Sequence, residues 1–205
     1  MLDADSSKIT ATELRGYLGY LFASDAEFHH HSDNSFHYPL VQYKKVNRKL
    51  LVLGLNNYSK IVFDKMSQLD SLITQDGKIS LFNVDLTTAT FEIKEEYAVY
   101  RFVSPWLALN ESNYEKFRSL EKNKRKAFLE KILTANVLSV LKGLGLRVKF
   151  QINAQINKFK PIQTEAHKNK FVGFYCEFAL NVALPKFLGI GKSVSKGFGV
   201  IERIK

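Results

Sequence analysis

The stretch Gly189-Ile190-Gly191-Lys192-Ser193-Val194-Ser195-Lys196-Gly197-Phe198-Gly199 places two Gly-x-Gly pairs around two lysines and two serines. Glycine has no Cβ, so such a backbone can turn sharply and approach a ligand closely. Successive N–H groups in a turn of this kind form a concave anion site, and lysines beside it add charge suited to phosphate. The stretch therefore predicts a loop that grips a nucleic-acid backbone. The predicted contacts are Gly189, Gly191, Lys192, Ser193, Ser195, Lys196, Gly197 and Gly199.

The loop has two other interpretations, a P-loop and a hairpin without a ligand. Gly191-Lys192-Ser193 resembles the end of a P-loop, but the pattern G-x-x-x-x-G-K-[ST] requires a glycine where the chain has Lys186. A P-loop also opens a helix, whereas residues 200–205 are typical of a short strand. A nucleoside-triphosphate site is therefore argued against. A glycine-rich hairpin that binds no ligand is the plainer alternative.

Charge is distributed unevenly along the chain. Residues 1–102 hold 11 Lys and Arg against 13 Asp and Glu, a balance of −2. Residues 103–205 hold 19 against 7, a balance of +12, so the net charge of +10 resides in the C-terminal half. Segregated positive charge is typical of proteins that bind a polyanion. A basic protein without such a partner is the alternative.

Several classes of protein do not fit the composition. The single Cys176 excludes an internal disulfide and a cysteine-built zinc site, and its apolar surroundings predict a buried structural thiol. No apolar run approaches the ~18 residues that span a membrane, so no membrane partner is predicted. The N-terminal residues lack the basic and apolar regions of a signal peptide. These features predict a cytoplasmic protein.

Hydrophobic periodicity predicts an α+β protein. Helical spacing covers residues 10–22, 58–69 and 113–142. Strand-like patterns cover residues 36–43, 49–55, 91–103, 146–157, 171–182 and 200–204. The first two of these strands are predicted to form a hairpin that turns near Asn47 and Arg48. The polar, lysine-rich residues 157–170 are predicted to be a flexible loop.

Each half of the chain combines helix with sheet, which indicates two tandem ferredoxin-like domains, an architecture shared with RNA-recognition modules. The N-terminal domain is predicted over residues 1–102, and the basic C-terminal domain over residues 103–205 carries the glycine-rich loop. A ferredoxin-like domain begins with a strand, yet residues 1–9 are mostly polar. The first strand is therefore predicted to be missing through truncation, very short, or supplied by another segment. An open sheet edge would promote self-association.

Several motifs, in order, resemble one family. The stretches Leu14-Arg15-Gly16, Phe28-His29-His30-His31 and His37-Tyr38-Pro39-Leu40-Val41-Gln42-Tyr43-Lys44 look like the N-terminal half of the CRISPR-associated repeat-RNA endonucleases of the Cas-six type. Residues 106–110, 113–116 and 128–133 are also similar to members of that family. Leu184-Pro185 and the glycine-rich loop are similar to its glycine-rich hallmark.

The resemblance implies two ferredoxin-like domains and cleavage of CRISPR precursor RNA within its repeats, with no metal or other cofactor. Cleavage implies attack by the ribose 2′-oxygen on the adjacent phosphate, which leaves a 2′,3′-cyclic phosphate and a 5′-hydroxyl. The implied partners are CRISPR repeat RNA, as precursor and as mature guide RNA, a homodimer, and a CRISPR effector complex. A non-catalytic RNA-binding subunit of such a complex is the alternative function.

One branch of the family has two histidines two residues apart and a tyrosine seven residues after the second, and this spacing falls on His29, His31 and Tyr38. The resemblance implies that the two histidines are the base and the acid, in an order that the sequence leaves open. Positions i and i+2 of an extended loop point to the same side, so both imidazoles would face one phosphate. Tyr38 would orient the phosphate or a histidine, and Lys44 is the predicted cation nearby. His37 is a second-rank contact.

Other interpretations of these residues stay open. Three consecutive histidines also occur in surface loops and in incidental metal sites, although no acidic or histidine partner at helical spacing reinforces a metal site. Tyr38 has the alternative of an ordinary core residue.

Overall fold

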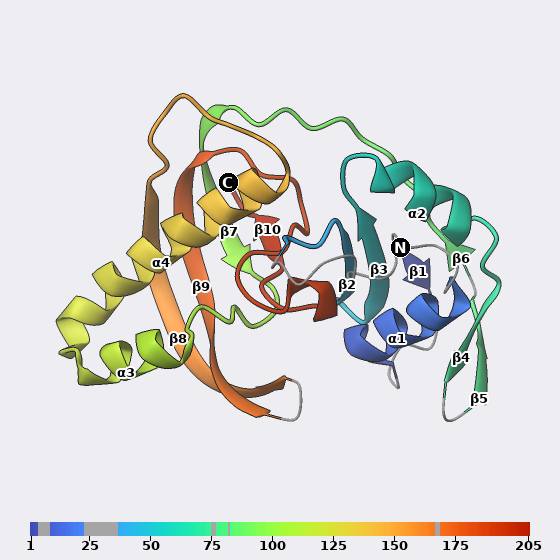
Figure 1. The fold of residues 1–205 in the computed structure, drawn as a ribbon, viewed down its shortest axis with the longest axis horizontal. Helices are drawn as coiled ribbons and strands as arrows, with labels where there is room; N and C mark the ends of the chain where they lie inside the picture. The colour runs from blue at the N-terminus through green and yellow to red at the C-terminus, as the bar shows by residue number, and fades with distance from the viewer. Residues whose placement is uncertain (4–8, 23–36, 75–76, 82, 167–168) are drawn as a thin grey trace. The chain divides into compact units, whose positions relative to one another are not determined.

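The chain divides into two compact units (Figure 1). The computed structural model describes residues 1–3, 9–22, 37–74, 77–81, 83–166 and 169–205. Unit 1 comprises Met1–Thr90 and Val194–Gly197, and unit 2 comprises Phe91–Ser193 and Phe198–Lys205. This division lies before the boundary after residue 102 that the sequence predicts. The difference arises because strand β7 (Glu95–Phe102) pairs with strands of unit 2.

Unit 1 has the strand order of a ferredoxin-like fold. Its main sheet runs β2-β3-β1-β6, and every neighbouring pair is antiparallel. A helix follows the first strand and another follows the third, which is the β-α-β-β-α-β plan, with a small hairpin inserted before the last strand. The elements are β1 (Leu2–Asp3), α1 (Ala11–Leu21), β2 (Val41–Val46), β3 (Lys49–Gly54), α2 (Tyr58–Met66), β4 (Ser71–Thr74), β5 (Gly77–Ser80) and β6 (Asn83–Val84).

Local chemistry explains where helix α1 begins. The Thr10 hydroxyl accepts a hydrogen bond from the Glu13 N–H at 3.1 Å, and the Glu13 carboxylate accepts the Thr10 N–H at 2.7 Å. This reciprocal capping box satisfies donors that a helix start leaves open. One face of the helix is apolar, and it packs with β2, β3 and α2 in the core of unit 1. This core includes Leu14, Leu18, Tyr43 and Leu50. The capping box and the stripe together fix both the start and the orientation of α1.

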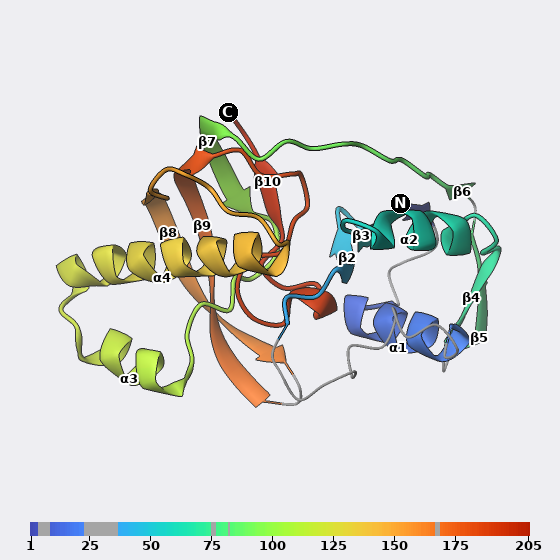
Figure 2. The ribbon, with the colours of Figure 1, turned by 45° about the horizontal axis from the view of Figure 1, so that its top comes forward.

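Unit 2 repeats the strand order with different connections. Its sheet runs β10-β7-β9-β8, again antiparallel throughout. Helix α4 lies across one face of this sheet, and the β8–β9 ribbon extends beyond its neighbours (Figures 1 and 2). The remaining elements are α3 (Glu111–Ser119), α4 (Lys122–Gly143), β8 (Ala154–Ala166), β9 (Asn169–Val182) and β10 (Ile201–Arg203). The 3₁₀ turn η3 (Val194–Lys196) lies between β9 and β10 in the sequence but belongs to unit 1.

The second crossover of unit 2, between β9 and β10, contains no α-helix. Every residue from 183 to 200 is described, and the only regular element there is the 3₁₀ turn η3. The glycine-rich loop therefore occupies the place where unit 1 has helix α2. This substitution is the main departure from the β-α-β-β-α-β plan.

The two tandem ferredoxin-like domains are confirmed, and so is the hairpin between β2 and β3. Asn47 and Arg48 both have positive φ, 50° and 63°, as a two-residue hairpin turn requires. The first strand is not missing. It is the very short one among the alternatives, because Leu2 pairs with Leu50 on one side and with Val84 on the other.

Three sequence-based predictions for unit 2 were wrong in detail. The single helix predicted over 113–142 is broken, because Leu120 adopts an extended backbone with ψ 141°. The strand predicted over 146–157 begins only at Ala154. The loop predicted over 157–170 is mostly strand, because residues up to Ala166 pair in register with β9. The sequence does not reveal such a strand, because both faces of an exposed ribbon can be polar and the apolar alternation that predicts a strand is then absent.

Candidate nucleic-acid interface

The glycine-rich loop has an unusual backbone. Gly191, Ser193, Gly197 and Gly199 all have positive φ, between 56° and 98°, and so does Phe187, two residues before the loop, with φ 65°. Glycine adopts these angles without a steric penalty, whereas other residues are strained there. Three of the predicted glycine contacts are therefore required by the path of the chain.

The same three glycines also permit close packing. A Cβ on Gly191 would lie 2.7 Å from the Trp106 ring, and one on Gly199 would lie 1.9 Å from the Ile190 carbonyl oxygen, both within unit 2. In unit 1, a Cβ on Gly197 would lie 2.6 Å from the Cβ of Ala11. The structure thus supplies an intramolecular reason for these glycines. Their contact with a nucleic acid stays a prediction.

Several backbone donors of the loop are already used inside the protein. The N–H of Ile190 donates to the Gly199 carbonyl at 2.8 Å, and the N–H of Gly199 donates to the Pro105 carbonyl at 2.9 Å. The N–H of Lys192 donates to the Leu107 carbonyl at 3.2 Å. These donors do not face a ligand. The side chains of the loop's lysines and serines are therefore better placed for contact than its backbone.

The two loop lysines differ in setting. Lys192 belongs to unit 2 and is exposed, whereas Lys196 belongs to unit 1 and is half-buried. Partial burial lowers the pKa of both ammonium groups from the ordinary lysine value, because an apolar surrounding disfavours charge. The nearby charge of Arg15 lowers the Lys196 pKa further.

Lys44 is buried on strand β2 of unit 1, and its side chain is 0 % exposed. Its Nζ donates to Gln42 Oε1 at 2.7 Å, and Gln42 Nε2 donates to the Pro39 carbonyl at 2.9 Å. Burial lowers the pKa of Lys44 to about 7. In this arrangement the ammonium does not reach solvent, so the predicted RNA contact would need its surroundings to open.

The predicted catalytic residues lie in and beside a segment that the structure leaves undescribed. His29 and His31 fall outside the described residues. Tyr38 is half-buried and His37 is exposed, in the short stretch that leads into β2. The structure therefore places only the tyrosine of the predicted set, close in sequence to Lys44 and before the same strand.

Arg15 belongs to the motif Leu14-Arg15-Gly16, but the sequence alone predicts no role for it. The Nε of Arg15 and the hydroxyl of Tyr43 are both buried without a hydrogen-bond partner among the described residues. The two groups interact, because the charge of Arg15 lowers the Tyr43 pKa, although burial of the phenol raises it by more. No periodicity signals such a pair, since α1 and β2 meet only in the folded unit.

Comparison with known proteins identifies the family of this fold. The family model described as the Cas6b N-terminal domain matches residues 2–92, and the Cas6b C-terminal domain matches residues 92–204. The chain belongs to the Cas6b family. A solved structure titled Cas6b is 27% identical, covers 99% of this chain and 98% of its own, and superposes with a TM-score of 0.89.

Other relatives of this Cas6b chain extend the comparison. A solved CRISPR RNA processing endoribonuclease Cas6b is 25% identical, covers 99% of this chain and 97% of its own, and has a TM-score of 0.73. An uncharacterised protein of Methanocaldococcus jannaschii is 41% identical over 115 residues, which are 56% of this chain and 78% of that protein.

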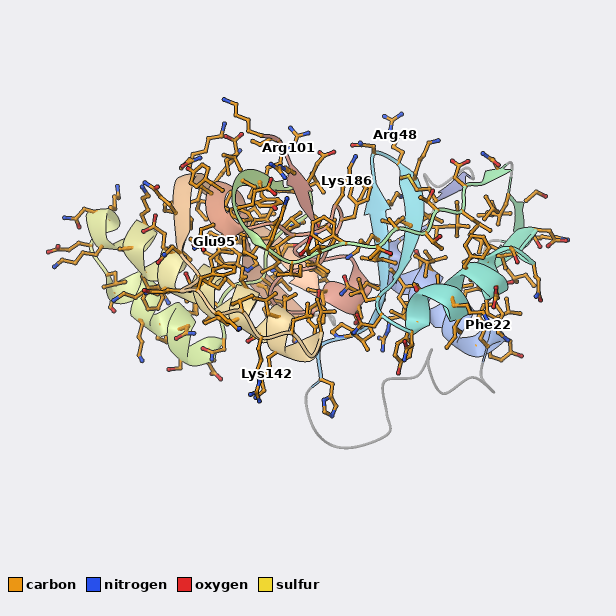
Figure 3. The ribbon with its side chains drawn as sticks, turned by 90° about the horizontal axis from the view of Figure 1, so that it is seen from above. Phe22, Arg48, Glu95, Arg101, Lys142 and Lys186 are labelled. Carbon is orange, nitrogen blue, oxygen red and sulfur yellow. The ribbon has the colours of Figure 1, made fainter. Side chains whose placement is uncertain are left out.

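Some charged side chains on the sheet of unit 2 of this Cas6b pair with one another. One row of side chains crosses four strands with alternating sign: Glu202, Arg101, Glu177 and Lys158. Arg101 Nη2 lies 3.0 Å from Glu202, and Lys158 Nζ lies 2.7 Å from Glu177. Arg101 and Lys186 lie at the same edge (Figure 3), and both pair with Glu202. The charges of this row are therefore matched within the protein.

Membrane-spanning helices and metal-ligand clusters were the two remaining features to compare with the sequence-based predictions, within the residues of this Cas6b that the structure describes. None of its helices has the length and apolar character needed to cross a membrane. Within the same residues, no group of three His, Cys, Asp or Glu side chains is arranged to hold a metal ion. Cys176 is buried, and burial raises the pKa of its thiol to about 12, which fits the predicted structural role.

Proposed function

We propose that this Cas6b chain is an endoribonuclease that cuts CRISPR precursor RNA within its repeats. The observation that carries the proposal is the match of both Cas6b domains in tandem, together with likeness over the full chain to a solved CRISPR RNA processing endoribonuclease Cas6b. A match to one domain alone would support the fold without the function.

The proposed reaction needs no metal. The 2′-oxygen attacks the adjacent phosphorus, and the bond from phosphorus to the 5′-oxygen breaks. A base takes the proton of the 2′-hydroxyl, and an acid gives a proton to the leaving 5′-oxygen. The products are a 2′,3′-cyclic phosphate and a 5′-hydroxyl. Imidazole suits both roles because its unperturbed pKa of ~6.5 leaves both forms populated near neutrality.

His29 and His31 are the proposed base and acid, and Tyr38 is proposed to orient the phosphate or one imidazole. The support for this assignment is the family spacing and the position of Tyr38 three residues before β2. Each proton-transfer role is typically worth ~10²–10⁴-fold in rate. Replacement of both histidines by alanine should therefore abolish cleavage within ordinary assay times.

The test is cleavage of the cognate repeat RNA in EDTA, with analysis of both new ends. We expect full activity in EDTA, a cyclic phosphate on one fragment and a 5′-hydroxyl on the other. RNA with a 2′-deoxy nucleotide at the scissile position should bind and stay intact. A 5′-phosphate product would overturn the mechanism. Tight binding without any product would instead favour the non-catalytic subunit.

The loop lysines are proposed to contact RNA phosphates. For single-stranded RNA, each phosphate contact contributes about −0.7 to the slope of log affinity against log salt. The double variant Lys192→Ala/Lys196→Ala should therefore bind more weakly across RNA sequences and show a flatter slope. An unchanged slope would exclude these two contacts. The homodimer and the effector complex stay proposals, and sedimentation with and without RNA tests the first.

A further inference from the structure

Unit 1 brings two cations together beside the glycine-rich loop. Arg15 lies on α1 one turn after Ala11, and Ala11 is the residue against which Gly197 packs. Lys196 is the last residue of η3 and directly precedes Gly197. The nearby charge of Arg15 lowers the pKa of Lys196, although burial lowers it by more. Like charges held close together are unfavourable. The fold keeps this pair within one compact unit nevertheless.

The one acidic side chain that helix α1 offers near Arg15 is already engaged. The sole acidic residue of α1 is Glu13, and its carboxylate already accepts from the backbone and the hydroxyl of Thr10 at 2.7 Å each. The Arg15 Nε and the Tyr43 hydroxyl have no acceptor among the described residues. A buried polar group without a partner calls for an explanation, and an absent ligand is one.

The side chains point to the chemistry of that ligand. A guanidinium presents donors in a planar fork that matches two oxygens of a phosphate, and an ammonium beside it adds a point charge. A phosphodiester has acceptor oxygens and no donor, so it meets the need of this neighbourhood.

We infer that Arg15 and Lys196 together form an anion site in unit 1 that holds one phosphate of the bound RNA. The inference rests on the proposed function for the identity of the ligand. It adds Arg15, a residue of the first helix, to the contacts predicted from the glycine-rich loop. The site explains why the loop sends Val194–Gly197 into unit 1.

The experiment measures binding of uncleavable repeat RNA, with a 2′-deoxy nucleotide at the scissile position, as a function of salt. Arg15→Gln should weaken binding about tenfold at low salt, since a hydrogen bond to a charged group is typically worth that much. Its log–log slope should flatten by about 0.7, the value of one contact. Arg15→Lys should keep the slope and recover part of the affinity.

Arg48→Gln is the matched control. Arg48 lies at the turn between β2 and β3 of the same unit, exposed and directed away from the strands (Figure 3). It should leave the slope unchanged. The double variant Arg15→Gln/Lys196→Gln should lose less affinity than the two single losses combined, because both residues would hold the same phosphate.

The outcomes separate this inference from the proposed function. Wild-type cleavage of repeat RNA with an unchanged slope in Arg15→Gln would overturn the inference and leave the endoribonuclease standing. An equal effect of Arg48→Gln would also overturn it. A flattened slope in a wild type that never cleaves would support the anion site and reject the nuclease. A wild type that binds no RNA would reject both.

Discussion

Units 1 and 2 share one strand order but differ in their second crossover. In unit 1 the chain passes from the third strand into helix α2, whereas in unit 2 it passes through the glycine-rich loop and η3. A helix satisfies its own backbone, but this loop relies on carbonyls from elsewhere in unit 2 and on four positive φ angles. An irregular crossover of this kind is harder to stabilise, and it gives unit 1 the segment Val194–Gly197.

The two units also differ in how their polar groups are matched. Across the sheet of unit 2, charges alternate and pair. In unit 1, the buried Lys44 donates to the side-chain amide oxygen of Gln42, and Arg15 and Tyr43 keep buried atoms without a partner among the described residues. Natural proteins depart from good matching mainly where function demands it. The charge row of unit 2 is thus matched within the protein, whereas buried atoms of Arg15 and Tyr43 in unit 1 are not.

The largest expected effect is in the core of unit 2. Trp106 is fully buried, stacks on Phe102 with ring centroids 5.2 Å apart, and donates to Asn136 Oδ1 at 3.0 Å. Trp106→Ala should lower the free energy of unfolding by ~3–5 kcal/mol. Chemical denaturation measures it, with Tyr97→Ala as the control, because Tyr97 is 68% exposed. A small loss would show that the glycine-rich loop does not rely on this indole.

Gly191→Ala should rank next. The new Cβ would meet the Trp106 ring at 2.7 Å, on a backbone with φ +98°, so both overpacking and strain oppose it. Each is typically worth ~1–3 kcal/mol. Gly16→Ala is the control, since a Cβ there meets nothing and Ala favours a helix by ~1 kcal/mol. In the Trp106→Ala background the penalty of Gly191→Ala should shrink, because the clash disappears and the φ strain stays.

Lys44→Met tests the proposed difference in polar matching between the two units. We expect this substitution to stabilise the fold. Replacement of a buried ion pair by apolar side chains of similar size is often neutral or stabilising by ~1–4 kcal/mol, and removal of one buried charge should act in the same direction. Lys45→Met should instead destabilise, because Lys45 Nζ donates to the Ile9 carbonyl at 2.9 Å. If Lys44→Met destabilises, its bond to Gln42 is structural and the contrast fails. RNA cleavage by the same variant tests the predicted role of Lys44.

The pH dependence gives a second measurement on Lys44. Its pKa is about 7 in the folded protein and near 10.5 for an ordinary lysine. Between these two values the unfolded chain holds a proton that the folded chain has released. Stability contributed by this group should therefore rise as pH rises through that window and fall as pH drops toward 7. In Lys44→Met this part of the slope should vanish.

The smallest expected effect is at the paired surface of unit 2. Arg101→Ala removes one exposed partner of Glu202, and Lys186 still pairs with that carboxylate at 3.3 Å. Exposed ion pairs are typically worth ~0.2–1 kcal/mol. Denaturation at low and high salt should show a small loss that salt diminishes further. A loss that matches Trp106→Ala would mean that the charge row is a main support of the sheet.

Local patterns predicted much of the fold. The capping residues Thr10 and Glu13 are three positions apart in the sequence, and the turn residues Asn47 and Arg48 are adjacent, so their structures follow from short-range chemistry. Most of strand β8 was not predicted, because its residues are polar and form a strand only through pairing with β9. The sequence left open whether the first strand was missing, very short or supplied by another segment, and only its pairing with Leu50 and Val84 decides this.

The sequence by itself determined the two α+β halves, the segregated charge and the glycine-rich loop, because composition and short-range periodicity encode them. Only the tertiary structure decided what the loop's glycines pack against, that Lys44 is buried, and that Arg15 lies near Lys196. The physical reason is distance along the chain: Arg15 and Lys196 come from opposite ends of the sequence. Their electrostatic coupling exists only after unit 1 has folded around Val194–Gly197.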